Sequence, residues 1–428
     1  MQSESLGPPE IPPHIIARPE HTVSRRDIEV EALKVLYRLH HAGYTAYLVG
    51  GGVRDLLLGK TPKDFDVVTD ARPGELRKLF RNSRIIGRRF RLVQVFFKGG
   101  HIVEVSTFRC RSEFDELAEP EAGPAKETTY GTPAEDAQRR DLTINGLFYN
   151  VADFSLVDYV GGMEDLEARR IRVIGNPAVR FERDPVRMLR VLRHAARIGF
   201  TIDAAAWKEI LAKGDLIRTC PPARVRDELL KDFHSGAARP FFELMLSSKL
   251  FYAIFPAWVG RLGASGESRL LELIGRLDLL VQNSYPLSDS LLWAVFLTAF
   301  LEPELQPRDF KDLREFIQEK IKAALGGIEF PRARQDEVSQ MLALEARMAP
   351  LLAKGQPIPA RLTRLRLYSA TWLLHQFKTA PEAELLERCD PEALPTPPPP
   401  AKRRRQRRRR PRGGRGRENK TGGGAGEG

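Results

Sequence analysis

The spacing of apolar residues divides the chain into a mixed first part and a helical second part. Between Ser24 and Ala42 apolar residues recur every three or four positions, which predicts a helix capped by Ser24. A second helix is expected to begin at Pro73. Short apolar runs predict the strands of a small mixed sheet: 46–49, 83–86, 92–97 and 102–107. From residue 178 onward the pattern is helical, so we expect an α+β head followed by an all-α neck and body.

Proline, glycine and charge mark the expected boundaries between these parts. With 428 residues, 42% of them apolar, the chain is long enough for two or three domains. The expected parts are a disordered lead-in (1–22), the head (23–160), the neck (161–228), a helical body (229–390) and a proline-rich spacer with an arginine-rich disordered tail (391–428).

Apolar runs and cysteines limit the environment and the cofactors that we expect. The longest apolar run, 291–301, is too short to span a bilayer, and no signal segment is visible. The three cysteines lie far apart and lack the spacing of metal ligands, which is typical of a protein in a reducing cytoplasm and argues against zinc.

The net charge of +12 is concentrated at one end of the chain. Residues 401–428 hold twelve Lys and Arg against two acids, so ten of the twelve net charges lie there. Arginine runs of this kind bind phosphates without sequence preference, although a purely solubilising tail is the alternative. The candidate RNA-binding residues of this tail are Arg403, Arg404, Arg405, Arg407, Arg408, Arg409 and Arg410.

The stretch with the most chemical content is Tyr47–Thr69, which reads YLVGGGVRDLLLGKTPKDFDVVT. Three glycines follow a strand and allow the backbone to approach an anion closely. Asp64 and Asp66 are expected on the next strand, where alternation points both carboxylates to one face, and this suits a pair of divalent ions. Arg54 adds a fixed fork for phosphate. Each feature alone is commonplace, but together they predict metal-dependent nucleotidyl transfer.

This stretch resembles the head of the DNA polymerase beta-like nucleotidyltransferase superfamily. Within it, GGGVRDLLLGKTPKDFD is similar to the branch that contains bacterial poly(A) polymerases and tRNA CCA-adding enzymes. The resemblance implies that Asp64 and Asp66 hold two Mg²⁺ ions, and that Gly51 and Arg54 hold the triphosphate or ribose of ATP.

A second segment, Arg139-Arg140-Asp141 with Thr143-Ile144-Asn145, resembles another motif of this family. The resemblance implies that Asp141 is a third catalytic acid and that Arg140 contacts the nucleotide. From its own pattern, the segment 133–150 predicts only an amphipathic helix with a charged first half.

The segment Phe181–Phe200, FERDPVRMLRVLRHAARIGF, predicts one helix whose arginines share a face. The simplest interpretation is a solvated basic face. The segment nevertheless resembles the nucleotide-selecting motif of the family, which implies that Asp184 and Arg187 read the base. Arg190 and Arg193 are then expected to meet the triphosphate.

Two further features of the head leave alternatives open. Gly87-Arg88-Arg89 predicts a basic turn that reaches phosphate or is merely solvated, and its surroundings resemble the poly(A) polymerase branch. Glu104 lies inside an apolar strand, where an unpaired carboxylate is unfavourable. It is expected either to join the metal-binding acids or to pair with Arg109, and we favour the pair.

These observations together predict template-independent polyadenylation of RNA 3′ ends from ATP, with a role in RNA decay. The expected partners are ATP and RNA (mRNA, small RNA and tRNA), and the expected state is a monomer in the bacterial cytoplasm. The alternatives are a tRNA CCA-adding or A-adding enzyme with the same site, and an inactive RNA-binding relative.

Overall fold

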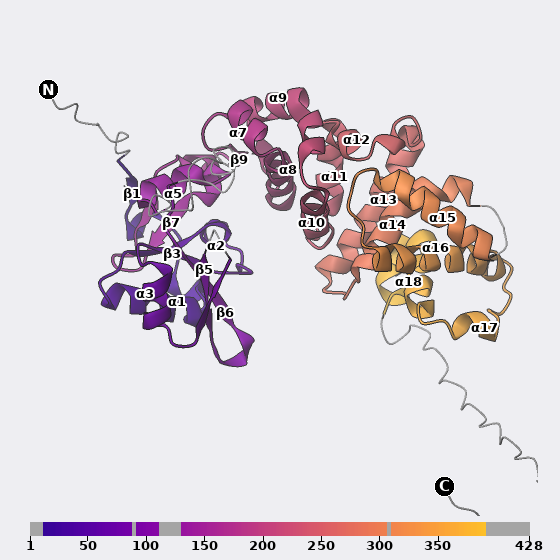
Figure 1. The fold of residues 1–428 in the computed structure, drawn as a ribbon, viewed down its shortest axis with the longest axis horizontal. Coiled ribbons are helices and arrows are strands. Elements are labelled where there is room, and N and C mark those ends of the chain that lie inside the picture. The colour runs from indigo at the N-terminus through magenta and orange to yellow at the C-terminus, as the bar shows by residue number, and fades with distance from the viewer. Residues whose placement is uncertain (1–11, 88–90, 111–129, 306–309, 391–428) are drawn as a thin grey trace, which may run out of the picture.

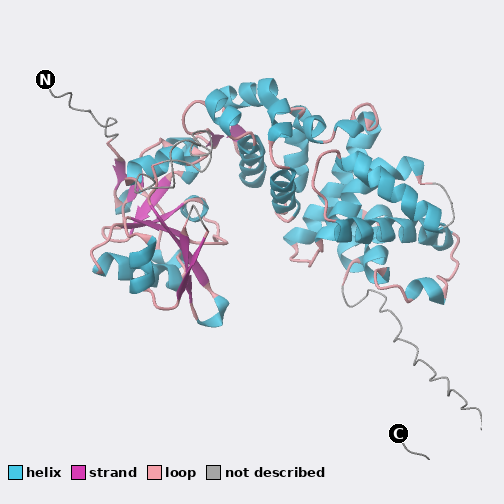
Figure 2. Cartoon of the chain, viewed as in Figure 1, coloured by secondary structure: helices cyan, strands magenta, loops and turns pink. Residues whose placement is uncertain are grey.

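The computed structural model describes residues 12–87, 91–110, 130–305 and 310–390. The molecule is an elongated arc in which the head, the neck and the body follow one another along the chain (Figure 1). Nearly all strands lie in the head, and the rest of the arc is helical (Figure 2). The expected fold class is therefore confirmed.

The head is built on an eight-stranded mixed sheet. Its order is β1 (His14–Ile16), β8 (Leu156–Asp158), β7 (Leu147–Asn150), β2 (Ala46–Val49), β3 (Asp66–Thr69), β6 (Ile102–Thr107), β5 (Leu92–Phe96) and β4 (Ser83–Ile86). The pair β3 and β6 is parallel and the other neighbours in this sheet are antiparallel.

The sheet corrects the expectation that residues 1–22 are a disordered lead-in. His14–Ile16 forms β1 and pairs with β8, about 140 residues away, while residues 1–11 lie outside the described part. A three-residue strand has no visible periodicity, and its partner is too remote in sequence for a local pattern to reveal it.

The helices of the head are α1 (Val30–His41), α2 (Gly51–Leu57), α3 (Pro73–Leu79) and α5 (Pro133–Arg139). α1 buries Ala32, Val35, Leu36 and Leu39 against the sheet, as its periodicity predicts. Its start differs from the prediction, because Ser24 caps a short 3₁₀ turn at Arg25–Asp27 and α1 begins only at Val30.

The neck contains α6 (Gly162–Glu167), α7 (Pro177–Arg183), α8 (Val186–Ile198), α9 (Ala204–Lys213) and α10 (Pro222–Phe233). It departs from the all-α expectation by one short parallel pair of strands, β9 (Arg170–Ile171) and β10 (Thr201–Ile202). The expected neck–body boundary at 228 falls inside α10, and one hydrophobic core continues from the neck into the body. The division between neck and body therefore stays a prediction.

The body holds the remaining helices: α11 (Ala238–Ser247), α12 (Leu250–Ile254), α13 (Gly263–Gln282), α14 (Asp289–Leu301), α15 (Phe310–Leu325), α16 (Arg332–Ala353), α17 (Ala360–Thr363), α18 (Tyr368–Thr379) and α19 (Leu385–Arg388). α14 is apolar on all sides because it is buried on all sides, and Phe296 on it packs against Trp258 and Trp293. Among the described residues, no helix combines the length and hydropathy needed to cross a membrane.

Candidate active site

The glycine turn after β2 brings the backbone close to the acidic segment. Gly50 has φ of 74° and directly precedes α2, a conformation that favours glycine. A Cβ on Gly52 would lie 3.1 Å from the Asp64 carbonyl oxygen, and one on Gly51 would lie 3.3 Å from Arg54 Nη2. Side chains at these positions would therefore crowd Asp64 and Arg54. The predicted approach of this turn to an anion stays a prediction.

The structure brings three carboxylates together at the start of β3. Asp66 opens the strand and Asp64 lies two residues before it, so the two aspartates do not share a regular strand as expected. Glu104 of β6 lies in register with Asp66 across the parallel pair. Loss of water around its carboxyl raises the pKa of Asp66, and the charges of Glu104 and Asp64 raise it further.

Glu104 corrects the pairing that the sequence favoured. Its carboxylate accepts a hydrogen bond of 2.9 Å from Gln94 Nε2, and Glu104 lies beside Asp66 instead of pairing with Arg109. The parallel register between β3 and β6 sets this position, and neither strand alone indicates it. The alternative interpretation of Glu104, as a third acid near the metals, stays a prediction.

Arg140 reaches the same place from the end of α5. The predicted helix over 133–150 ends at Arg139, and the chain then turns back into the sheet as β7. Asp136 is fully buried and binds both Arg139 and Arg140, with Arg140 Nη2 2.8 Å from its Oδ2. Burial alone would raise the pKa of Asp136, but the two guanidinium groups outweigh it and hold the pKa below its usual value. A Cβ on Gly50 would lie 3.6 Å from Arg140 Nη1, so this cation faces the glycine turn.

Asp141 lies at the junction with the neck. Its carboxylate accepts a hydrogen bond of 2.7 Å from Arg190 Nε and another from the Leu142 backbone N–H. Burial would raise the pKa of Asp141, but the adjacent Arg190 guanidinium lowers it far below the ordinary value. The structure thus couples Asp141 to α8, whereas Asp64, Asp66 and Glu104 form a separate group.

Arg54 also joins the head to α8. Its Nη1 donates to Asn145 Oδ1 at 2.7 Å and to His194 Nδ1 at 3.2 Å, while its Nε donates to Asp55. Burial lowers the pKa of His194 well below its ordinary value, so the ring is neutral and Nδ1 accepts the hydrogen bond. The sequence analysis missed His194, which lies among the arginines of the same helix.

Asp184 lies in a break between two helices, which corrects the prediction of one helix over 181–200. α7 ends at Arg183 and α8 begins at Val186, because Pro185 lacks an amide hydrogen and restricts the residue before it. Asp184 and Arg187 are both buried, and Arg187 Nε lies 3.5 Å from Asp184 Oδ2. The structure therefore brings the two predicted base-reading residues together.

Arg224 of α10 is a further residue of this group that sequence reasoning missed. Its Nη1 and Nη2 donate to the two carboxylate oxygens of Asp184 at 2.7 and 3.1 Å. A fork of this kind fixes the plane of the carboxylate. The residues are 40 positions apart, and no local pattern connects them.

Arg193 does not lie on an exposed basic face. Its side chain is 5% exposed and binds Asp232 through Nε at 2.7 Å and through Nη2 at 2.9 Å. Nη1 binds Glu228, and Nη2 also donates to the Glu228 carbonyl oxygen. These partners of Arg193 all lie on α10, and the expected contact between Arg193 and a triphosphate has no support from this placement.

Other predicted residues fall outside the described part of the chain. This applies to Arg88 and Arg89 of the basic turn and to the tail arginines 403–405 and 407–410. Their roles stay predictions.

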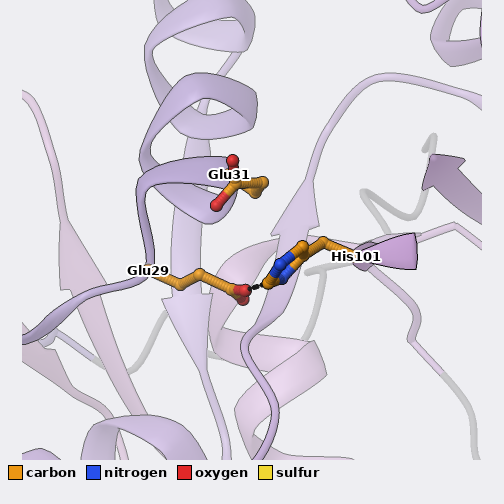
Figure 3. A group of neighbouring side chains, drawn as sticks. All are labelled: Glu29, Glu31 and His101. Carbon is orange, nitrogen blue, oxygen red and sulfur yellow. Dashed lines mark hydrogen bonds and ion pairs between the residues drawn. The ribbon is translucent and has the colours of Figure 1, made fainter. Parts of the chain in front are cut away.

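A separate group of possible metal ligands lies beside α1. Atoms of Glu29, Glu31 and His101 approach within 4.8 Å of one another, the only such trio in the described ranges (Figure 3). The group is partly exposed and already bonded, with Glu29 2.5 Å from His101 and Glu31 3.4 Å from Lys34. It includes none of the residues of the candidate site.

Comparisons with known proteins show the family to which the chain belongs. The family described as "Poly A polymerase head domain" matches residues 46–172, and "Probable RNA and SrmB- binding site of polymerase A" matches residues 199–259. Poly(A) polymerase I of Salmonella typhi is 39% identical over 388 residues, covering 88% of this chain and 82% of the relative. Poly(A) polymerase I of Escherichia coli O157:H7 is 45% identical over 290 residues, covering 65% of this chain and 62% of the relative.

The crystal structure of the Bacillus stearothermophilus CCA-adding enzyme in complex with CTP shares the fold. Its TM-score is 0.61 at 24% identity, with 84% of this chain and 80% of that chain covered. The mixed sheet, the glycine turn and the acidic start of β3 define a nucleotidyltransferase. Within that class, the chain belongs to the bacterial poly(A) polymerase I family.

Proposed function

We propose that this chain adds adenylates from ATP to RNA 3′ ends without a template and releases pyrophosphate. The observation that carries the proposal is the group of Asp64, Asp66 and Glu104 beside the glycine turn, in a chain 39% identical to a poly(A) polymerase I over most of its length. We further infer a role in RNA decay, with mRNA, small RNA and tRNA ends as substrates.

The acidic group suits divalent metal. Mutual repulsion contributes to the raised pKa of Asp66, and a bound cation would relieve that repulsion. Asp64 and Asp66 are the proposed ligands of two Mg²⁺ ions, with Glu104 beside them. Bound there, the ions would supply Lewis-acid activation of the RNA 3′-hydroxyl and stabilise charge on the leaving pyrophosphate.

The cationic and base-reading residues complete the proposal. Arg140 and Arg54 lie against the glycine turn, where they hold the triphosphate. Asp184 accepts a hydrogen bond from the adenine amino group and Arg187 donates to a ring nitrogen. Arg224 keeps Asp184 oriented for this contact. The proposed third catalytic acid, Asp141, is held by Arg190.

Primer extension tests the activity directly. Purified protein is given Mg²⁺ and each NTP in turn, with either an unstructured RNA or a tRNA that lacks its 3′ end. The proposal expects long ladders with ATP alone on both RNAs. Addition that stops after one to three nucleotides, and only on tRNA, would indicate the tRNA-repair activity instead. RNA binding without addition under any metal would indicate an inactive relative.

The metal assignment is tested by Asp64→Ala. The variant should lose nucleotide addition but retain RNA binding, because the proposed role of these acids is to bind metal and not to bind RNA. Asp70→Ala is the matched control, since Asp70 is an exposed acid just past the other end of the same strand. Full activity in Asp64→Ala would refute the assignment.

A further inference from the structure

One side of the head carries an apolar groove that the proposed reaction does not use. The groove has a volume of about 820 Å³ and is lined by α1, by the connection between α3 and β4, and by the end of β5. In Figure 1 α1 and α3 lie at the lower edge of the head, away from the neck helices. None of its lining residues belongs to the candidate active site.

The helix α1 has a second apolar stripe that faces this groove. Its first stripe is buried in the head core. The second consists of Val30, Leu33 and Tyr37, at spacings of three and four residues, and Val30 is 59% exposed. An apolar stripe with this spacing is the seam on which a second helix packs. The stripe covers about two turns, roughly 11 Å, which matches a short amphipathic helix.

The charged side chains that line the groove are all basic. Lys34, Arg38 and Arg81 line it together with His41, and no Asp or Glu belongs to the lining. Glu31 lies near the rim, 3.4 Å from Lys34. The rim therefore favours a partner whose polar face is acidic.

The floor favours protein over RNA. Leu33 and Val95 of the lining are aliphatic and offer no surface for base stacking, although the lining also contains aromatic rings. Cations of the groove itself already lie over two of its rings: Arg38 is 5.6 Å from the centre of Phe80, and Lys34 is 5.9 Å from the centre of Phe97.

We propose that this groove docks an acidic amphipathic helix of a partner protein. Apolar residues of that helix pack on the stripe of Val30, Leu33 and Tyr37. Its carboxylates pair with Lys34, Arg38 and Arg81. This proposal concerns a surface outside the catalytic group and does not depend on the reaction.

The test uses the full chain and a fluorescein-labelled 18-residue helical peptide with leucines at i, i+3, i+4 and i+7 and glutamates elsewhere. Fluorescence anisotropy should show saturable binding, and the same peptide with lysines in place of glutamates should bind at least ten-fold more weakly. The triple variant Lys34→Glu/Arg38→Glu/Arg81→Glu should lose at least ten-fold in affinity, as should Leu33→Ser.

The matched control carries the same charge change on exposed lysines elsewhere, Lys208→Glu/Lys322→Glu/Lys354→Glu. It should bind the peptide as the unmodified chain does. Equal losses in both triple variants, or no saturable binding up to about 100 μM, would overturn the proposal. Unchanged thermal midpoints and primer-extension rates exclude misfolding as the cause of a loss.

Two further results would identify another occupant and overturn the proposal. If an 18-residue oligoadenylate displaces the peptide, and the groove variant loses the same affinity for it, the groove binds RNA. If light scattering shows a dimer that the groove variant converts to a monomer, the occupant is a second copy of the chain.

Discussion

Replacing Arg193 by methionine separates a structural role from a nucleotide-binding role. The substitution removes the Arg193 guanidinium from Asp232 and Glu228, whose side chains are only 1% and 8% exposed. Asp232 keeps Arg197 at 3.5 Å and Glu228 keeps Lys231 at 2.9 Å, both of them more exposed than Arg193. Removing one partner of a buried ion pair costs about 3–5 kcal/mol when the other charge is left without compensation, so this range is the upper limit for Arg193→Met. Solvent screening hardly weakens these ion pairs, because the Arg193 side chain is only 5% exposed. In a unit of this size, that loss lowers the unfolding midpoint by roughly 6–20 °C.

The pH dependence of this variant has a definite sign. Burial raises the pKa of Asp232 even while Arg193 is present. Without Arg193, the folded state holds protons on these carboxyls more tightly than the unfolded state does. The free energy of unfolding of the variant is therefore closest to that of the unmodified chain at acid pH. The difference between the two grows as the pH rises through the folded-state pKa values.

The assay is thermal unfolding at several pH values, combined with the KM for ATP in primer extension. Arg218→Met is the matched control: the Arg218 side chain is 56% exposed, and the change should shift stability by no more than about 0.5 kcal/mol. The double variant Arg193→Met/Asp232→Leu should recover part of the loss. An unchanged midpoint for Arg193→Met, together with a strongly raised KM for ATP, would contradict the structural assignment and restore the triphosphate role.

Three further outcomes are expected. Glu104→Gln should lower the pKa of Asp66 by removing a nearby charge, and should slow nucleotide addition about ten-fold or more; a rate equal to that of the unmodified chain would exclude Glu104 from the metal group. His194→Leu leaves one donor of Arg54 unsatisfied, so the KM for ATP should rise while His194→Gln retains most of the affinity; equal effects of the two would mean that only packing matters. Removing residues 401–428 should flatten the salt dependence of RNA binding, by a slope of about 4 if six phosphate contacts are lost, and leave addition to saturating primer intact.

The parts of the site that the sequence predicted are those made by neighbours in the chain. β2, the glycine turn and Asp66 follow one another within about twenty residues, so local rules on strands, glycine and alternation suffice to place them. The exception is Asp64, which lies before the strand and outside its alternation. Glu104 joins the group only through the parallel register of β6, which no single segment encodes.

The errors about α8 share one cause. A regular series of arginines usually indicates a solvated face, and the family resemblance instead implied phosphate binding. Neither interpretation predicts a buried helix face whose arginines pair with acids of another helix. One signal was available: Glu228 and Asp232 are spaced by four residues, as are Arg193 and Arg197, so two helices carry complementary charges at matching intervals. Pro185 likewise marked the break between α7 and α8.

The arginines of α8 connect the head to the neck, and so connect the two parts of the proposed active site. Arg190 binds Asp141 of the head, and Arg187 donates to the backbone of Arg140, whose side chain faces the glycine turn. Arg193 fixes the same helix to α10. α10 in turn carries Arg224, the partner of Asp184. The proposed base-reading residues on the neck and the proposed phosphate-binding residues on the head are therefore joined through one helix, so a change that tilts α8 is expected to alter both at once.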